Sequence, residues 1–187
     1  MDGHVLKVKN RRATRCGFTL VELLVVIIII GILAAVAIPQ FGTASEDAKI
    51  AALDQNLSCV RSAIELYSYQ HNSTYPGTVA LHTDLAAQAP TAHADAAAAF
   101  TLQLTMYSNA NGNTCAEKSD LYPYGPYLKS GMPENSLPAA TAAAAPSAVN
   151  VTTDSTPLEA DNSPATGWKT SSVTGQFIAN NSAYATR

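Results

Sequence analysis

The sequence of 187 residues has little charge and few cysteines, and both shortages narrow the classes of protein it can encode. Charged residues make up 13% of the chain, about half the usual share, which argues against a charged disordered chain and against a nucleic-acid-binding surface. Three cysteines are too few for a disulfide-dense scaffold, and no Cys-x-x-Cys or mixed Cys/His cluster indicates structural zinc. No nucleophile elbow, phosphate-binding glycine loop, zincin or kinase motif occurs. We therefore expect neither an enzyme nor a protein that contacts nucleic acid directly.

The basic residues are concentrated at one end of the chain. Five of the eleven lie within the first 17 positions, namely Lys7, Lys9, Arg11, Arg12 and Arg15. The remainder carries six basic and thirteen acidic residues. The length suits one domain of ordinary size with an appended segment. Residues 1–17 and the rest of the chain are therefore expected to have different fates.

A hydrophobic run of 21 residues follows the basic segment, from Phe18 to Ile38. As a helix it would measure about 31 Å, which matches a hydrocarbon core of roughly 30 Å. The first charges after it are acidic, Glu46 and Asp47, so the positive-inside rule keeps residues 1–17 cytoplasmic. The run predicts a single membrane pass, with the bulk of the protein outside the cytoplasm.

Two simpler explanations of this run remain open. A secretory signal peptide would be cleaved after Ala35-Val36-Ala37, but the run exceeds the usual apolar length of about 7 to 15 residues, and Pro39 lies just past the cut. An uncleaved anchor explains the length and the orientation but not the acidic Glu22. Either explanation would fit a monomeric binding protein that is tethered to the membrane or secreted.

Glu22 is the residue that separates these alternatives. An acidic group in a lipid-embedded helix costs about 2.5 to 3.5 kcal/mol unless it finds a partner, and the apolar run contains no basic residue. We therefore expect its partner to come from another chain, or from an amine created by cleavage. A cut between Gly17 and Phe18 would place a positive α-amino group four residues before Glu22.

The segment from Arg15-Cys16-Gly17-Phe18-Thr19-Leu20-Val21-Glu22 to Ala37-Ile38-Pro39 resembles the N-terminal motif of type IV pilins and type II secretion pseudopilins. The resemblance implies that a prepilin peptidase removes the leader 1–17 by cutting after Gly17, and methylates the amine of Phe18. It implies that Glu22 serves subunit recruitment. It also implies an α+β fold, in which a long kinked N-terminal helix packs on a small antiparallel β-sheet head.

Beyond the transmembrane helix 18–38, an amphipathic helix is expected over residues 39–71. Apolar residues recur there at alternating spacings of 3 and 4, at Ile50, Leu53, Leu57, Val60, Ile64 and Tyr67. Pro39 is expected to kink the helix, because its ring removes an internal hydrogen bond. The turn formers of residues 72–77 predict its end. The stripe is expected to pack on the protein's own head.

Residues 72–187 are expected to form this extracytoplasmic head. Alanine-rich residues 84–100 suggest a helix in part, the alternation over 101–107 suggests a strand, and 109–113 a loop. The low-complexity stretch 139–148 predicts a flexible loop. Two short strands are expected at 167–169 and 173–179. The segments Gly125-Pro126-Tyr127-Leu128 and Pro133-Glu134-Asn135 resemble parts of major-pseudopilin heads.

Two groups of head residues suggest further chemistry. Cys16 leaves with the leader, so Cys59 and Cys115 remain outside the cytoplasm, where a disulfide can form; two separate thiols are the alternative. The carboxylates of Asp154, Glu159 and Asp161 offer hard oxygen ligands for calcium, which some major pseudopilins are known to bind in a C-terminal loop. A merely solvated cluster is the alternative, and no cofactor is required.

The function that the resemblance implies is structural. We expect a subunit of a type IV pilus-like filament, favouring a pseudopilin that acts in type II protein secretion. The alternative is a type IV pilin used in adhesion, twitching motility or DNA uptake. Expected partners are copies of the chain, minor pilins or pseudopilins, the prepilin peptidase, and an inner-membrane assembly platform with a cytoplasmic ATPase. The expected location is the bacterial inner membrane, from which the filament assembles.

Overall fold

The computed structural model describes residues 18–78, 81–83, 91–92, 95–137 and 145–187. The chain divides into two compact units, Met1–Ser45 and Glu46–Arg187. Helix α1 (Leu20–Gln70) contributes residues to both units, and it begins and ends close to the limits expected from the sequence. Its helical backbone continues through Pro39, and the kink expected at this residue stays a prediction.

The C-terminal half of α1 carries the predicted apolar stripe. Five of its six residues, Leu53, Leu57, Val60, Ile64 and Tyr67, are buried, each with at most 1% of its surface exposed, whereas Ile50 is only partly buried. Their alternating spacing of 3 and 4 places them on one face of a helix. The stripe is therefore a core face within the second unit, as the pattern predicted.

The end of α1 is formed by two residues in the left-handed region. Asn72 and Ser73 have φ angles of 53° and 60°, and the Ser73 N–H donates to the carbonyl of Ser68 at 2.9 Å. This geometry supplies donors to carbonyls that the helix itself leaves unpaired. The buried Pro76 follows a few residues later, so the predicted stop over 72–77 is confirmed.

A three-stranded sheet contains β5 (Ala145–Thr152), β6 (Thr166–Ser171) and β7 (Phe177–Ala179). Strands β6 and β7 are antiparallel and lie where the two short strands were expected, but β5 and β6 are parallel. The expected antiparallel sheet is therefore mixed. The connection 153–165 is long enough for the crossover that parallel strands need.

Strand β5 also corrects the loop expected over 139–148, because residues 145–148 belong to the strand. The preceding residues of that stretch lie outside the described part of the chain. Pro146 is tolerated because β5 is an edge strand of its sheet. The strand was not predicted because the low-complexity stretch shows no strand pattern, and because its partner, β6, is distant in the sequence.

Helix α2 (Ala96–Thr105) replaces the strand expected over 101–107. The carboxylate of Asp95 caps it by accepting a hydrogen bond from the Ala98 N–H at 2.7 Å. The hydroxyls of Thr101 and Thr105 donate to carbonyls four residues earlier, so both hydroxyls find hydrogen-bond acceptors within the helix. The alternation of polar and apolar residues over 101–107 arose from the positions of these threonines and did not indicate a strand. The preceding alanine run, with its high helix propensity, favours the helix that is observed.

A second sheet has the order β2-β1-β4-β3 and consists of short strands. Their bounds are β1 (Leu81–Thr83), β2 (Thr91–Ala92), β3 (Tyr107–Ser108) and β4 (Thr114–Cys115). The loop predicted over 109–113 joins β3 to β4, and the Asn109 side-chain oxygen accepts hydrogen bonds from two backbone N–H groups of this loop. The loop prediction is thereby confirmed.

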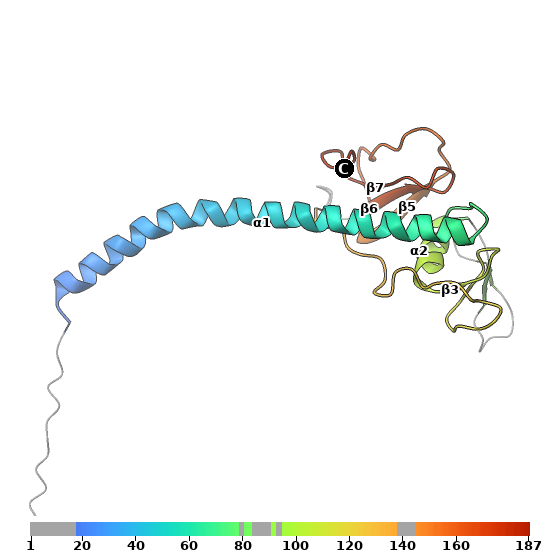
Figure 1. Cartoon of the computed structure of the whole chain (residues 1–187). Helices are drawn as coiled ribbons and strands as arrows, with labels where there is room; N and C mark the ends of the chain where they lie inside the picture. The colour runs from blue at the N-terminus through green and yellow to red at the C-terminus, as the bar shows by residue number, and fades with distance from the viewer. Residues whose placement is uncertain (1–17, 79–80, 84–90, 93–94, 138–144) are drawn as a thin grey trace, which may run out of the picture. The chain divides into compact units, whose positions relative to one another are not determined.

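The core of the second unit lies between α1, α2 and the sheet β5-β6-β7 (Figure 1). Phe177 stacks on Phe100 of α2 with ring centroids 6.0 Å apart, and lies 5.2 Å from the Trp168 ring. All three aromatic side chains are almost fully buried. The residues of α1 that join them form the apolar stripe, so one hydrophobic cluster unites the helix with the head.

Residues 133–137 fasten the head to α1 and to β6. The Trp168 indole N–H donates to the carbonyl of Pro133, and the Asn56 amide donates to that of Glu134. The buried Asn135 side chain donates to the Gly167 carbonyl at 2.8 Å. The segment that resembles a pseudopilin head motif is therefore a structural junction of this fold.

Candidate functional site

The N-terminal end of α1 is the first candidate site, and it is built around Thr19 and Glu22. One oxygen of the Glu22 carboxylate accepts hydrogen bonds from the Thr19 backbone N–H at 3.0 Å and from the Thr19 hydroxyl at 2.9 Å. The Glu22 N–H donates in turn to the Thr19 hydroxyl oxygen at 3.2 Å. This is a capping box, which satisfies backbone donors at a helix N-terminus, where negative charge is also favoured.

This local partner of Glu22 was not predicted from the sequence. We expected the Glu22 carboxylate to find its partner only in another chain or a new amine, yet Thr19 already donates to it. The pattern Thr-x-x-Glu before an apolar run is a known sequence sign of a capping box, and could have revealed the contact. The capping box offers no positive charge, so the need for a counter-charge inside a membrane remains.

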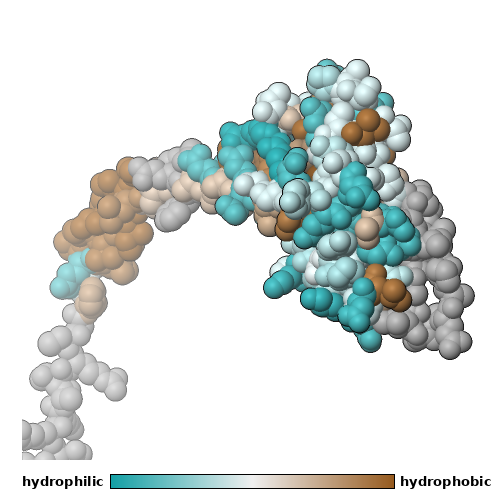
Figure 2. Space-filling view, turned by 45° about the vertical axis from the view of Figure 1, so that its right-hand side comes forward, coloured by the Kyte–Doolittle hydropathy of each residue, from teal (hydrophilic) through white to brown (hydrophobic). Residues whose placement is uncertain are grey.

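The apolar surface of α1 begins beside this cap. Leu20–Ala37 has a mean hydropathy of 3.1, and it is the one segment in the described residues that is long and apolar enough to cross a membrane. Its large hydrophobic side chains are between 45% and 80% exposed. Figure 2 shows them as a nearly continuous hydrophobic surface. A surface of this size calls for lipid or for other protein.

The predicted cleavage point lies at the edge of the described chain. Gly17 lies outside the described residues, whereas Phe18 is described and is 79% exposed. The α-helix starts at Leu20, two residues later. Cleavage after Gly17 and methylation of Phe18 stay predictions, as does the leader 1–17.

The two cysteines expected to form a disulfide are both free thiols. Cys59 lies exposed on α1, and Cys115 is fully buried in β4. The core stripe of α1 consists of other residues, so Cys59 faces away from the head core. The predicted Cys59–Cys115 bridge is thus absent, and the alternative of two separate thiols describes this structure.

The three carboxylates proposed for calcium do not converge. Asp154, Glu159 and Asp161 line one open cavity of about 600 Å³, but no three His, Cys, Asp or Glu side chains of the described ranges form a group that could hold a metal ion. Asp161 is instead bound by the Lys169 ammonium, with Nζ 2.7 Å from Oδ1. A donor set in which one of the three carboxylates already pairs with a lysine does not fit calcium.

His71 at the end of α1 is a structural residue. Its ring is buried, with Nδ1 2.8 Å from the Tyr67 carbonyl oxygen and Nε2 3.1 Å from the Ser108 hydroxyl. Nearby, the Tyr127 hydroxyl donates to the side chain of Gln70 at 2.6 Å. Burial is the main cause that raises the pKa of Tyr127 to about 12. Both ring nitrogens of His71 are engaged, so it offers no metal ligand.

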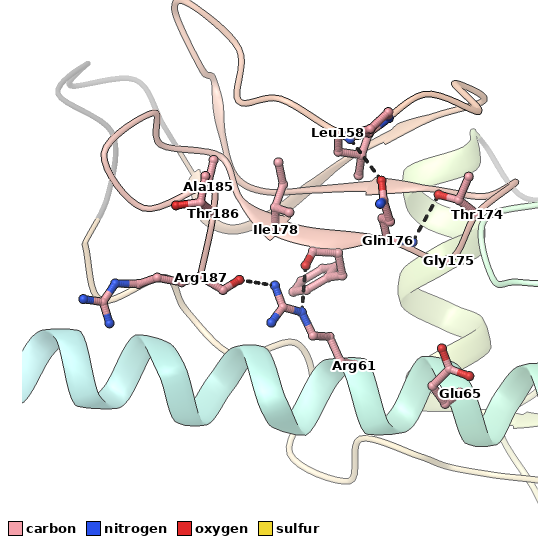
Figure 3. A pocket seen from close by; sticks show the side chains of 12 residues that line it. Arg61, Glu65, Leu158, Thr174, Gly175, Gln176, Ile178, Ala185, Thr186 and Arg187 are labelled. Carbon is pink, nitrogen blue, oxygen red and sulfur yellow. Dashed lines mark hydrogen bonds between the residues drawn. The ribbon is translucent and has the colours of Figure 1, made fainter.

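The open cavity drawn in Figure 3 has a volume of about 450 Å³ and lies between α1 and β7. Arg61 reaches across it from α1, donating from Nε to the Phe177 carbonyl at 3.0 Å and from a terminal nitrogen to the Arg187 carbonyl. The Arg187 guanidinium bonds the Asp54 carboxylate at 2.7 Å. These contacts fix the last residues of the chain to α1.

Residues 12–38 match the family described as the prokaryotic N-terminal methylation motif. The match spans the predicted cleavage point after Gly17, the capping box and the apolar helix segment. Together with the relatives described next, it confirms the resemblance to the type IV pilin and type II secretion pseudopilin superfamily.

Three curated proteins are each similar to about a third of the chain. The type II secretion system core protein G of Pseudomonas aeruginosa is 35% identical over 68 residues, and that of Klebsiella michiganensis 37% over 68, each covering 36% of this chain. The type IV narrow pilus major component PilA5 of Thermus thermophilus is 46% identical over 54 residues, or 29% of this chain.

Each alignment covers 47% of the relative, so the chain spans about half the length of the curated relatives it matches. No solved structure matches the chain. The similarity to each relative therefore covers at most 36% of this chain, and the larger part of the chain lies outside each alignment.

Proposed function

We propose that this chain is a structural subunit of a type IV pilus-like filament and not an enzyme. The observation that carries the proposal is the methylation motif of residues 12–38, placed on a helix whose apolar surface is exposed along Leu20–Ala37. A hydrophobic helix joined to a compact polar head suits a polymer in which helices bundle inside and heads lie outside. No bound cofactor is needed for this role.

We propose that the precursor chain is first inserted into the bacterial inner membrane. The basic leader 1–17 stays in the cytoplasm, the segment 18–38 crosses the bilayer once, and the head lies outside the cytoplasm. A prepilin peptidase then cuts after Gly17 and methylates the new amine of Phe18. The apolar helix stays on the mature subunit, unlike an ordinary signal peptide.

Assembly uses the new N-terminus. The mature Phe18 amine carries a positive charge, and the Glu22 carboxylate of a neighbouring subunit can pair with it inside the membrane. Before assembly, Thr19 supplies hydrogen bonds to the same carboxylate. We propose that copies of the chain, minor subunits and a membrane platform with a cytoplasmic ATPase complete the machine.

Within this class we favour a pseudopilin of type II secretion, because the protein G relatives align over 68 residues and because the segments 125–128 and 133–135 resemble major-pseudopilin heads. A second candidate is a type IV pilin for adhesion, twitching motility or DNA uptake. Its support is the higher identity, 46%, to the PilA5 pilus component.

Mass spectrometry of the mature N-terminus tests the proposal directly. We expect the native protein to begin with N-methylated Phe18. An N-terminus at Ile38 would indicate a secreted protein, and an intact Met1 would indicate a plain anchor; either result would refute a processed filament subunit. The matched control is Gly17→Asp in the leader, which should leave an unprocessed chain in the membrane.

A chromosomal deletion separates the two candidates. Loss of exported enzymes from the medium, with normal surface motility and DNA uptake, would support the secretion pseudopilin. The opposite pattern would support the pilin. Complementation with the full chain serves as the control in both assays.

A further inference from the structure

The sheet β5-β6-β7 has a polar face opposite its core face. Asn150 pairs in register with Lys169, which pairs with Ile178, and Asn180 lies two residues beyond Ile178. Because side chains alternate along a strand, Asn150, Lys169 and Asn180 share one face. The opposite face carries the buried register partners Val149, Trp168 and Ala179.

Asp161, from the connection 153–165, lies on this polar face and is bound by all three side chains. Its Oδ1 contacts the Lys169 ammonium at 2.7 Å. Its Oδ2 accepts from the Asn150 amide at 2.8 Å and from the Asn180 amide at 2.9 Å, and its backbone N–H donates to the Asn180 side-chain oxygen at 2.8 Å. Both carboxylate oxygens are therefore occupied by protein donors.

The contact is largely shielded from water. The Lys169 side chain is 13% exposed and that of Asp161 is 31% exposed, while Asn180 is fully buried. Burial by itself raises the pKa of the Asp161 carboxyl, but the hydrogen bonds and the charge of Lys169 outweigh it, so this pKa is lowered overall. Removing one partner of a partly buried, hydrogen-bonded ion pair leaves the other charge without compensation. The free energy of unfolding of the protein then falls substantially.

Further contacts hold the same connection on the sheet. The Ser171 hydroxyl donates to the Asp154 carbonyl at 2.6 Å, and the Leu158 N–H donates to the Gln176 side chain at 3.0 Å. Neither contact supplies positive charge. Lys169 is the only cationic residue that lines the cavity shared by Asp154, Glu159 and Asp161 in the described structure.

We propose that Lys169 is the built-in counter-cation of the connection 153–165, and that it holds this connection on the sheet without a divalent metal ion. The ammonium takes the place that a bound cation would have beside the Asp161 carboxylate. The stability of the head is then independent of calcium and of chelators. This inference concerns the head alone and holds whether or not the chain polymerises.

The test uses the full-length chain in detergent, with Trp168, the only tryptophan of the sequence and the direct neighbour of Lys169, as the fluorescent reporter. Thermal unfolding is measured in EDTA, in magnesium chloride and in calcium chloride at matched ionic strength. We expect the same midpoint in all three. A midpoint that rises in calcium but not in magnesium would overturn the proposal.

Substitutions then test the lysine itself. Lys169→Met should lower the midpoint by about 3 to 6 °C, whereas Lys129→Met, at an exposed lysine, should leave it unchanged. Lys169→Arg, which keeps the positive charge, should lie nearer the native value. Equal midpoints for Lys169→Met and Lys129→Met would contradict the proposal.

A double-variant cycle covers the case in which one variant folds poorly. Asp161→Asn should also lower the midpoint, and the pair Lys169→Met with Asp161→Asn should lower it by less than the sum of the two single effects. Fully additive losses would mean that the two side chains act independently, and would remove the counter-cation role.

Discussion

The imidazole of His71 lies flat on the phenol ring of Tyr67, with ring centroids 3.7 Å apart and 4° between the planes. The two residues are one helical turn apart at the end of α1. Because the Tyr67 carbonyl can only accept, His71 Nδ1 carries the ring proton, and Nε2 accepts from the Ser108 hydroxyl. The contact ties the last turn of α1 to β3.

This arrangement predicts a loss of head stability in mild acid. Burial, the largest influence, lowers the pKa of His71, against the opposing effect of hydrogen bonds to the backbone of Tyr67 and Asn109. The unfolded chain therefore binds the proton first as pH falls below about 6.5. Stability should be full above this pH and should fall below it, by at most about 1.4 kcal/mol per pH unit for one histidine.

Urea unfolding followed by Trp168 fluorescence between pH 8 and pH 5 measures this effect. His71→Phe keeps a ring against Tyr67 but cannot titrate, so we expect a less stable protein with a flatter pH profile. The difference between the two profiles isolates His71 from the other histidines. Parallel profiles would show that this ring does not control the acid sensitivity.

Asn135 is predicted to be the most sensitive residue of the junction 133–137. It is 3% exposed, its amide donates to the Gly167 carbonyl, and its side-chain oxygen accepts from the Leu137 N–H. Asn135→Ala leaves both groups without their partner and should cost about 2 kcal/mol of unfolding free energy. Asn162→Ala, at an exposed position, should change it by less than about 0.5 kcal/mol. Urea denaturation of both variants measures these changes. Equal midpoints for the two variants would contradict a stabilising role of Asn135 in the junction 133–137.

The two thiols should differ sharply in reactivity. In the folded mature chain, a water-soluble maleimide should label the exposed Cys59 quickly and the buried Cys115 only after denaturation. Peptide mapping by mass spectrometry reports each cysteine separately. Cys59→Ser should abolish the fast reaction and Cys115→Ser should leave it intact. Recovery of a disulfide-linked peptide pair from the native protein would contradict the free thiols.

The sequence predicted those parts of the fold that depend on local pattern. The stripe from Leu53 to Tyr67 identifies a buried helix face because its spacing fits only a helix. The stop after α1 was visible because residues 72–77 combine turn formers with Pro76, which cannot continue a helix. The N-terminal motif was identified by its resemblance to pilins and pseudopilins, and a family model matches it over residues 12–38.

Other parts depend on contacts that sequence distance conceals. Strand β5 pairs with β6 across the connection 153–165, and its alanine-rich start carried no strand pattern. At Gly167, a Cβ atom would overlap the Pro146 carbonyl, so glycine permits the close approach of these two strands. Asp161 looked like a calcium ligand because Lys169 reaches it only once the sheet has formed.

Glu22 has two possible tasks, and four variants separate them. If its charge must pair with the Phe18 amine of a neighbour, then Glu22→Ala and Glu22→Gln should both be cleaved normally but enter filaments poorly. Thr19→Val keeps that charge and loses only the cap, at about 1 kcal/mol of helix stability, so it should still assemble, as should Thr19→Ser.

If Glu22 serves only to cap the helix, the variants should behave in the opposite way. Glutamine can replace glutamate in a capping box, so Glu22→Gln would then assemble like the native chain, while Thr19→Val would fail together with Glu22→Ala. Shearing of surface filaments followed by immunoblotting measures incorporation, and the mature N-terminus measures cleavage in the same cells. A carboxylate embedded in lipid needs a positive partner, which neutral hydrogen bonds do not supply. We therefore expect both Glu22 variants to assemble poorly and both Thr19 variants to assemble, in a filament that depends on charge pairing between subunits.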